Sequence, residues 1–86
     1  MEKIKTKIRD IMINDFDVDE NDQDFTFTTD LFDFGYLDSF GAVELRGILE
    51  KTFNIEISNK DLIQYPLNTV EEIANFISTK ASQKLN

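Results

Sequence analysis

Three stretches of the 86-residue sequence repeat apolar residues at the spacing of an α-helix, and this period constrains the fold more than any other feature. The pattern predicts a first helix over roughly residues 2–14, a second from Ser39 to about Phe53, and a last helix that begins near residue 70. One side of each helix should then face a shared core. The residues predicted on these sides are Ile4, Ile8, Ile11 and Met12, then Leu45, Ile48, Leu49, Thr52 and Phe53, and finally Val70, Ile73, Ala74 and Ile77.

Two capping signals add a short helix and mark the start of the last one. Ser58 with Asp61 three residues later has the pattern of a capping box, and Pro66 would stop the helix that follows it. Thr69 and Glu72 repeat the pattern ahead of the last helix. The sequence therefore predicts an all-α fold, a four-helix bundle with three main helices and a short third helix.

A long connection, from Asp15 to Leu37, separates the first two predicted helices. It exceeds the ~12–15 residues that structureless loops of compact domains rarely pass, so we expect it to be functional or partly ordered. Thr29 or Asp30 could cap a short helical turn within it. The aromatic residues expected to pin this connection to the core are Phe16, Phe25, Phe27, Phe32 and Phe34.

The same part of the chain is strongly acidic, with nine acidic residues and no Lys or Arg in residues 15–38. The alternating aspartates of residues 15–19 suggest a calcium loop. However, Glu20 replaces the required glycine, and Thr26 replaces the closing bidentate glutamate. We therefore expect no specific metal site and only weak, diffuse binding of divalent cations.

Composition excludes several classes of protein. The chain has no cysteine and no histidine, which leaves Ser39 without an obvious general base, so we expect no catalytic residue and no enzyme activity. The net charge of −8 disfavours nucleic acid and favours basic protein surfaces as partners. No apolar run approaches the ~18 residues of a membrane span, and the basic N-terminus is no signal peptide. We expect a cytoplasmic monomer with a single domain over residues 1–86 and an ordered core over about residues 2–79.

Ser39 lies where the acidic connection meets the second predicted helix. A phosphate on a hydroxyl in the first turn of a helix would face unpaired backbone N–H groups and the positive end of the macrodipole. By position alone, a serine that caps the helix by accepting one of these N–H groups is the more common explanation. Whether Ser39 is a modification site or a helix cap has to be judged from the neighbouring residues.

The second predicted helix carries a smaller apolar stripe on roughly the opposite side from its core residues. Phe40, Val43 and Gly47 form this stripe, and Glu44, Glu50 and Lys51 border it. A bordered apolar cluster indicates a docking surface. A mid-helix glycine costs ~1 kcal/mol relative to alanine, and here it would let a partner approach the backbone closely. The alternative is that Phe40 is buried under the preceding connection.

The residues around Ser39 resemble those of the acyl carrier protein superfamily, and the similarity spans nearly the whole chain. The residues that carry it are Leu31-Phe32, Gly35, Asp38-Ser39-Phe40, Val43-Glu44-Leu45, Glu50 and Phe53. In that family the serine of an Asp-Ser-Leu motif carries a 4′-phosphopantetheine arm. The resemblance implies that Ser39 is the attachment residue and Asp38 its acidic neighbour. The positions that it implies for contact with partner enzymes are Phe40, Val43, Glu44 and Glu50, with Gly47 on the same face.

The resemblance further implies the function of a discrete acyl carrier protein. A separate phosphopantetheinyl transferase would use Mg²⁺ and coenzyme A to place the arm on Ser39. The thiol of the arm would then hold an acyl intermediate as a thioester. A loading ligase and downstream acyltransferase or synthase enzymes would be the other partners.

Two alternatives remain open at the level of the sequence. Phe40 replaces the usual leucine of the motif, and glycines stand at positions 41 and 47, where acidic residues or methionine are frequent in fatty-acid carriers. The pattern from Leu31 to Gly41 is also similar to D-alanyl carrier proteins and to other aminoacyl or peptidyl carriers. From a different class, the chain could be a small acidic helical interaction module that never bears the arm.

Overall fold

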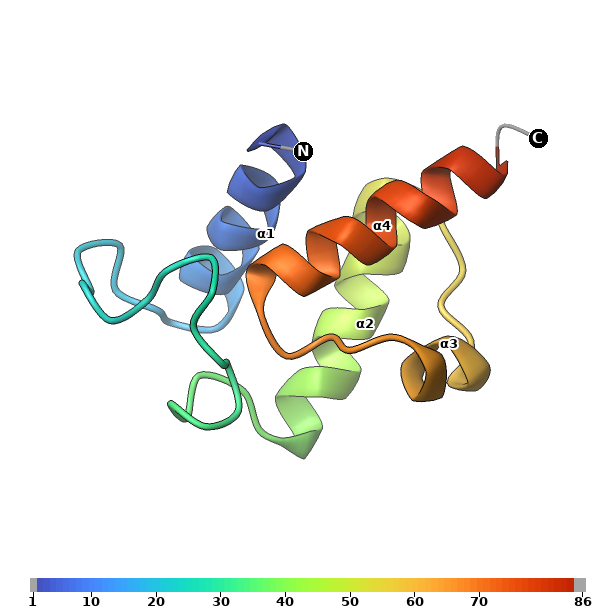
Figure 1. Cartoon of the computed structure of the whole chain (residues 1–86). Helices are drawn as coiled ribbons and strands as arrows, with labels where there is room; N and C mark the ends of the chain where they lie inside the picture. The colour runs from blue at the N-terminus through green and yellow to red at the C-terminus, as the bar shows by residue number, and fades with distance from the viewer. Residues whose placement is uncertain (1, 85–86) are drawn as a thin grey trace.

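The computed structural model describes residues 2–84, and four helices form the regular structure of this part of the chain. Their bounds are Glu2–Asp15 for α1, Ser39–Phe53 for α2, Asn59–Gln64 for α3 and Val70–Lys84 for α4 (Figure 1). The predicted all-α class with a short third helix is confirmed. Residues 1, 85 and 86 of the predicted domain lie outside the described residues.

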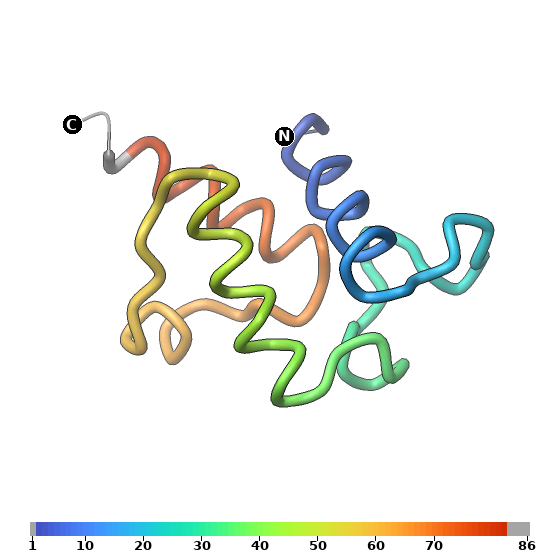
Figure 2. The backbone as a smooth tube through the Cα atoms, turned by 180° about the vertical axis from the view of Figure 1, so that it is seen from behind, coloured from blue at the N-terminus to red at the C-terminus, as the bar shows by residue number. Residues whose placement is uncertain are grey.

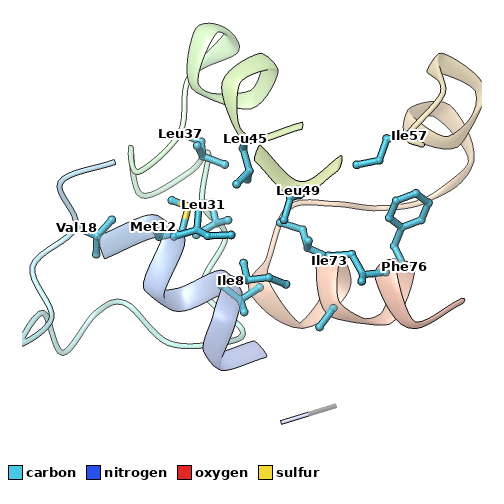
Figure 3. Packing of buried hydrophobic residues seen from close by; sticks show 14 of the residues in the cluster. Ile8, Met12, Val18, Leu31, Leu37, Leu45, Leu49, Ile57, Ile73 and Phe76 are labelled. Carbon is cyan, nitrogen blue, oxygen red and sulfur yellow. The ribbon is translucent and has the colours of Figure 1, made fainter. Parts of the chain in front are cut away.

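The core lies where the three long helices meet. α1 packs against α4, and α2 crosses behind α4 in Figure 1 and in front of it in Figure 2. Ile8 and Met12 of α1 are fully buried, as is Ile73 of α4. Leu45 and Leu49 are the buried residues of α2, and Figure 3 shows Leu45 pointing toward Met12. The predicted core sides of all three helices are therefore confirmed, except that Thr52 is exposed on the last turn of α2.

The long connection is ordered by hydrogen bonds to other parts of the chain. Its Leu31 N–H donates to the Asn68 carbonyl at 2.8 Å, and the Glu71 N–H donates to the Phe27 carbonyl at 2.9 Å. These two bonds fasten the connection to the segment that leads into α4. Because they pair backbone groups of the connection with those of a distant segment, they explain how a connection of this length keeps one conformation.

A helical turn in this connection corrects the prediction for two of its aromatic residues. The Asp30 carboxylate accepts the N–H groups of Phe32 at 3.0 Å and Asp33 at 2.9 Å, so Asp30 caps the turn. Successive side chains of a helical turn point in different directions. Leu31 is consequently fully buried, whereas Phe32 and Phe34 are exposed and do not pin the connection. Phe25 is buried, and Phe16 and Phe27 pack against the core as expected.

Thr29 orders a different part of the connection. Its hydroxyl donates to the Asp24 carbonyl at 2.6 Å and accepts the Thr26 N–H at 2.9 Å. Nearby, the Tyr36 hydroxyl donates to the Asp22 carboxylate at 2.7 Å. This hydrogen bond, with desolvation and the negative charge of Asp22, raises the pKa of Tyr36 to about 12.

Polar contacts also fix the starts of α3 and α4. The predicted capping box of Ser58 and Asp61 is present at the start of α3. At the start of α4, the Thr69 hydroxyl accepts the Glu72 N–H at 3.0 Å, while the Glu72 carboxylate accepts the Asn68 N–H instead of that of Thr69. α4 runs on to Lys84, beyond the end of its apolar pattern.

Two features of residues 2–84 bear on function. No helix in this part of the chain is long and apolar enough to cross a membrane. The same residues hold no group of three or more acidic, histidine or cysteine side chains arranged to bind a metal ion.

Candidate functional site

Ser39 is the first residue of α2, and its neighbour Asp38 is the residue that caps the helix. The Asp38 carboxylate accepts the Gly41 N–H at 2.7 Å. The interpretation of Ser39 as the N-cap is therefore wrong, because another oxygen already occupies the capping position. Ser39 is exposed, and within residues 2–84 no side chain or backbone group engages its hydroxyl. The geometry leaves this hydroxyl available for covalent modification.

The turn before α2 holds Ser39 in place. Both Tyr36 and Leu37 donate their N–H groups to the Leu31 carbonyl, at 2.8 and 3.0 Å, and Leu37 is buried. Gly35 has a φ of +78°, a conformation that glycine adopts without steric cost. This turn is anchored at both ends by buried leucines, so the serine is presented from a fixed position.

Gly41 stands where a side chain would crowd the cap. A Cβ atom at this position would lie 3.2 Å from the Leu37 side chain and 3.3 Å from the capping oxygen of Asp38. Both distances are tighter than ordinary van der Waals contact. The glycine that departs from the common fatty-acid pattern thus fits the close packing of the capped turn.

An open hollow of about 340 Å³ lies beside the start of α2. Aromatic rings from Phe16, Tyr36 and Phe40 line it together with four carboxylate residues. The four are Asp15, Asp17, Asp38 and Glu44. The surroundings of Ser39 are consequently negative, which favours approach by a basic protein surface.

The predicted stripe on the outer side of α2 is exposed. Phe40 is 83% exposed and Val43 is 70% exposed, so neither is buried under the preceding connection. Glu44 is exposed beside them, and a Cβ atom at Gly47 would meet nothing within 4 Å outside its own stretch of helix. Glu50 differs from this group, because its carboxylate accepts the Ile57 N–H at 2.9 Å and thereby ties the end of α2 to the next segment.

Sequence reasoning missed a groove between α2 and α3. Its volume is about 570 Å³, and its lining is mainly apolar. Leu45 and Leu49 contribute from α2, while Leu62 and Ile63 contribute from α3, where Ile63 is 86% exposed. The adjacent leucine and isoleucine in this helix of six residues were the available signal.

Arg46 was also missed, and it supports the groove from the α2 side. Its guanidinium donates to the Ile57 carbonyl and, at 3.1 Å, to the Asn59 side chain. Both acceptors lie at the entry to α3. A helical position on the rim of the core stripe was the only sequence signal for this role.

Comparisons with known proteins agree with this geometry. Two D-alanyl carrier proteins, from Streptococcus pyogenes serotype M5 (strain Manfredo) and serotype M1, are each 50% identical to this chain over 44 residues. The match covers 51% of this chain and 56% of each relative, so the chain spans just over half the length of the curated relatives it matches. Residues 6–77 match the family described as phosphopantetheine attachment site. The chain therefore belongs to this family of phosphopantetheine carriers, whose prosthetic group is a covalently attached 4′-phosphopantetheine.

Proposed function

We propose that this chain is a carrier protein whose Ser39 oxygen forms the phosphodiester bond to 4′-phosphopantetheine. The observation that carries the proposal is the exposed hydroxyl of Ser39, left free by the Asp38 cap at the start of α2. When bound, the group supplies a thiol that can hold a carboxylic acid as a thioester. In this proposal partner enzymes perform the chemistry on the cargo, and the chain has no catalytic residue of its own.

The residues around Ser39 fit a phosphate diester at this position. Ser39 lies in the first turn of a helix of 15 residues, where the macrodipole favours a negative group. Asp38 takes the Gly41 N–H and so holds the first turn in helical geometry. Leu37 is buried directly before this cap, which keeps the attachment point at the surface and the backbone fixed.

D-alanine, or another amino acid, is the cargo that the comparisons favour. The relatives named D-alanyl carrier protein are identical to this chain at half of the 44 aligned residues. A loading ligase that adenylates the amino acid would then be a partner, together with the phosphopantetheinyl transferase. We place the chain in the cytoplasm, a reducing compartment that a protein without cysteine suits.

An acyl chain is the second candidate cargo. The observation that favours it is the groove of about 570 Å³ between α2 and α3, which is lined mainly by apolar side chains. Alkyl chains bind in such concave apolar sites because burial removes their surface from water. Downstream acyltransferase or synthase enzymes would be the partners in this case.

The outer stripe of α2 is the surface that we propose for partner enzymes. Phe40 and Val43 offer apolar contact close to Ser39, Glu44 offers charge, and Gly47 leaves room for close approach. Apolar anchors bordered by charge are typical of protein interfaces. Glu50 belongs to this surface by position, although its carboxylate is occupied by the Ile57 N–H.

Intact mass spectrometry tests the proposal. The purified chain, incubated with a phosphopantetheinyl transferase, Mg²⁺ and coenzyme A, should gain the mass of one phosphopantetheine. Ser39→Ala should gain nothing, whereas Ser82→Ala, which changes another exposed serine, should be modified like the parent. Modification of Ser39→Ala would refute the assignment of Ser39, and no gain in the parent would favour the interaction module.

A second incubation separates the cargoes. The modified chain is offered to a D-alanine-activating ligase in one reaction and to a fatty-acid-activating ligase in another. A mass gain of one D-alanyl group alone supports the first candidate, and a gain of an acyl chain alone supports the second. The cargo assignment fails if neither group is added by ligases that load their own carrier proteins in parallel.

A further inference from the structure

The side chain that α3 buries is a charged one. Asp61 is the buried residue of this helix, whereas Leu62 and Ile63 are exposed at 44% and 86%. In Figure 1, α3 lies on the far side of the molecule from α1, below the C-terminal half of α4. A helix of six residues is not stable by itself in water, so its position depends on the contacts of its few anchored residues.

The Asp61 carboxylate makes two kinds of contact at once. It accepts the Ser58 N–H at 3.0 Å, which closes the capping box and satisfies a donor at the start of α3. It also lies 2.8 Å from the ammonium of Lys80 on α4. Both partners of this ion pair are mostly shielded from water, since their side chains are 11% and 24% exposed. A pair with little exposure is screened less by solvent than a surface pair.

Other contacts hold the two ends of this segment, among them the hydrogen bond that Arg46 of α2 donates to the Asn59 side chain at 3.1 Å. Ile57 is buried before α3, and the ring of Tyr65 packs on the ring of Phe76 at 5.0 Å between centroids after it. Lys80 itself stands 5.9 Å from the centre of the Phe76 ring. Between these ends the Asp61–Lys80 ion pair joins the body of α3 to α4.

We propose that Asp61 is a positioning residue, which through Lys80 fixes α3 as one wall of the groove between α2 and α3. Leu62 and Ile63 line this groove from α3, so displacement of the helix changes its width. Loss of the ion pair should release α3 while α1, α2 and α4 keep their core contacts, because none of the buried apolar residues lies in α3. The inference concerns the position of α3 and holds whether or not Ser39 is the attachment residue.

Amide hydrogen exchange of the 86-residue chain tests the inference directly. In Lys80→Gln, peptides that cover residues 58–65 should exchange about tenfold faster. The loss of a hydrogen bond between charged groups typically changes the equilibrium constant for local opening by at least this factor. Asp61→Asn should show the same increase, since its amide keeps an oxygen for the Ser58 N–H but loses the charge for Lys80. The double variant should not exchange faster than either single variant, as expected for two residues that act through one contact.

Glu56→Gln is the matched control, because it removes the same charge from an exposed residue just before α3. Its exchange should equal that of the parent. Binding of the apolar dye anilinonaphthalene sulfonate reports on the groove in the same variants and should change in Asp61→Asn and Lys80→Gln but not in Glu56→Gln. Unchanged exchange of residues 58–65 in both ion-pair variants would overturn the proposal. Equal acceleration in α1 and α4 would also overturn it, because Asp61 would then act on global stability.

Discussion

The Asp38 carboxylate accepts the Gly41 N–H at 2.7 Å, so Asp38 and not the adjacent Ser39 caps α2. Because Asp38 supplies the cap of α2, the Ser39 hydroxyl is not needed to cap the helix. A Cβ atom at position 41 would lie 3.3 Å from the capping oxygen, so a glycine at this position leaves room for the cap. Under the proposed function, modification of the Ser39 hydroxyl would therefore leave the cap of α2 in place.

This relationship predicts stability effects of different size for two neighbouring substitutions. Asp38→Ala should lower the free energy of unfolding by ~0.5–2 kcal/mol, as loss of a helix cap does. Ser39→Ala should change it by less than about 0.5 kcal/mol, since the residue is exposed and alanine suits a helix. Urea denaturation of both variants measures the difference. A Ser39→Ala loss as large as that of Asp38→Ala would restore the serine to the capping role.

The two sides of α2 should respond differently to truncation. Leu49→Ala should lose ~2–5 kcal/mol of stability, because Leu49 is buried in the core. Phe40→Ala and Val43→Asp should leave thermal stability almost unchanged but slow modification by the transferase, since both side chains are exposed near Ser39. The check compares melting curves with transferase kinetics for all three variants. If Phe40→Ala or Val43→Asp melts as early as Leu49→Ala, the proposed partner surface is refuted.

Charge reversal at two glutamates of α2 should affect association with a partner and stability to different extents. Glu44→Lys should slow association with the transferase mainly at low salt, because an exposed border charge acts chiefly on the on-rate. Glu50→Lys should in addition cost roughly 1 kcal/mol of stability, since it removes the acceptor of the Ile57 N–H. Stopped-flow association at two salt concentrations, together with urea denaturation, measures both effects. Equal stability of the two variants would show that the Glu50–Ile57 bond contributes nothing.

The Tyr36–Asp22 hydrogen bond predicts a loss of stability in alkaline solution. The bond raises the pKa of Tyr36 from 10.0 to about 12 in the folded chain, so the folded state retains a proton that the unfolded state releases. Its stabilising contribution is complete below pH 10.0 and is lost as the pH rises from there through about 12. Tyr36→Phe should lack this component. The measurement is the difference between the urea midpoints of parent and variant across that pH range, and a constant difference would contradict the prediction.

The sequence by itself determined the helices, their core sides and the position of the candidate site. Local rules suffice for these features: a helical period places Ile8 and Met12 on one side of α1, and the pairing of Ser58 with Asp61 specifies the start of α3. The motif around Ser39 is a contiguous stretch of chain, so its family resemblance is also visible without a structure.

Only the tertiary structure decided which side chains those elements leave exposed or engage with distant partners. Phe32 and Phe34 look like core residues in the sequence, but the turn capped by Asp30 directs Leu31 inward in their place. Glu50 looks like a surface charge in the sequence, but in the folded chain its carboxylate accepts the Ile57 N–H. The groove wall likewise depends on Asp61 meeting Lys80, a residue of another helix. Such contacts depend on how separate elements pack together, and no local spacing rule encodes that arrangement.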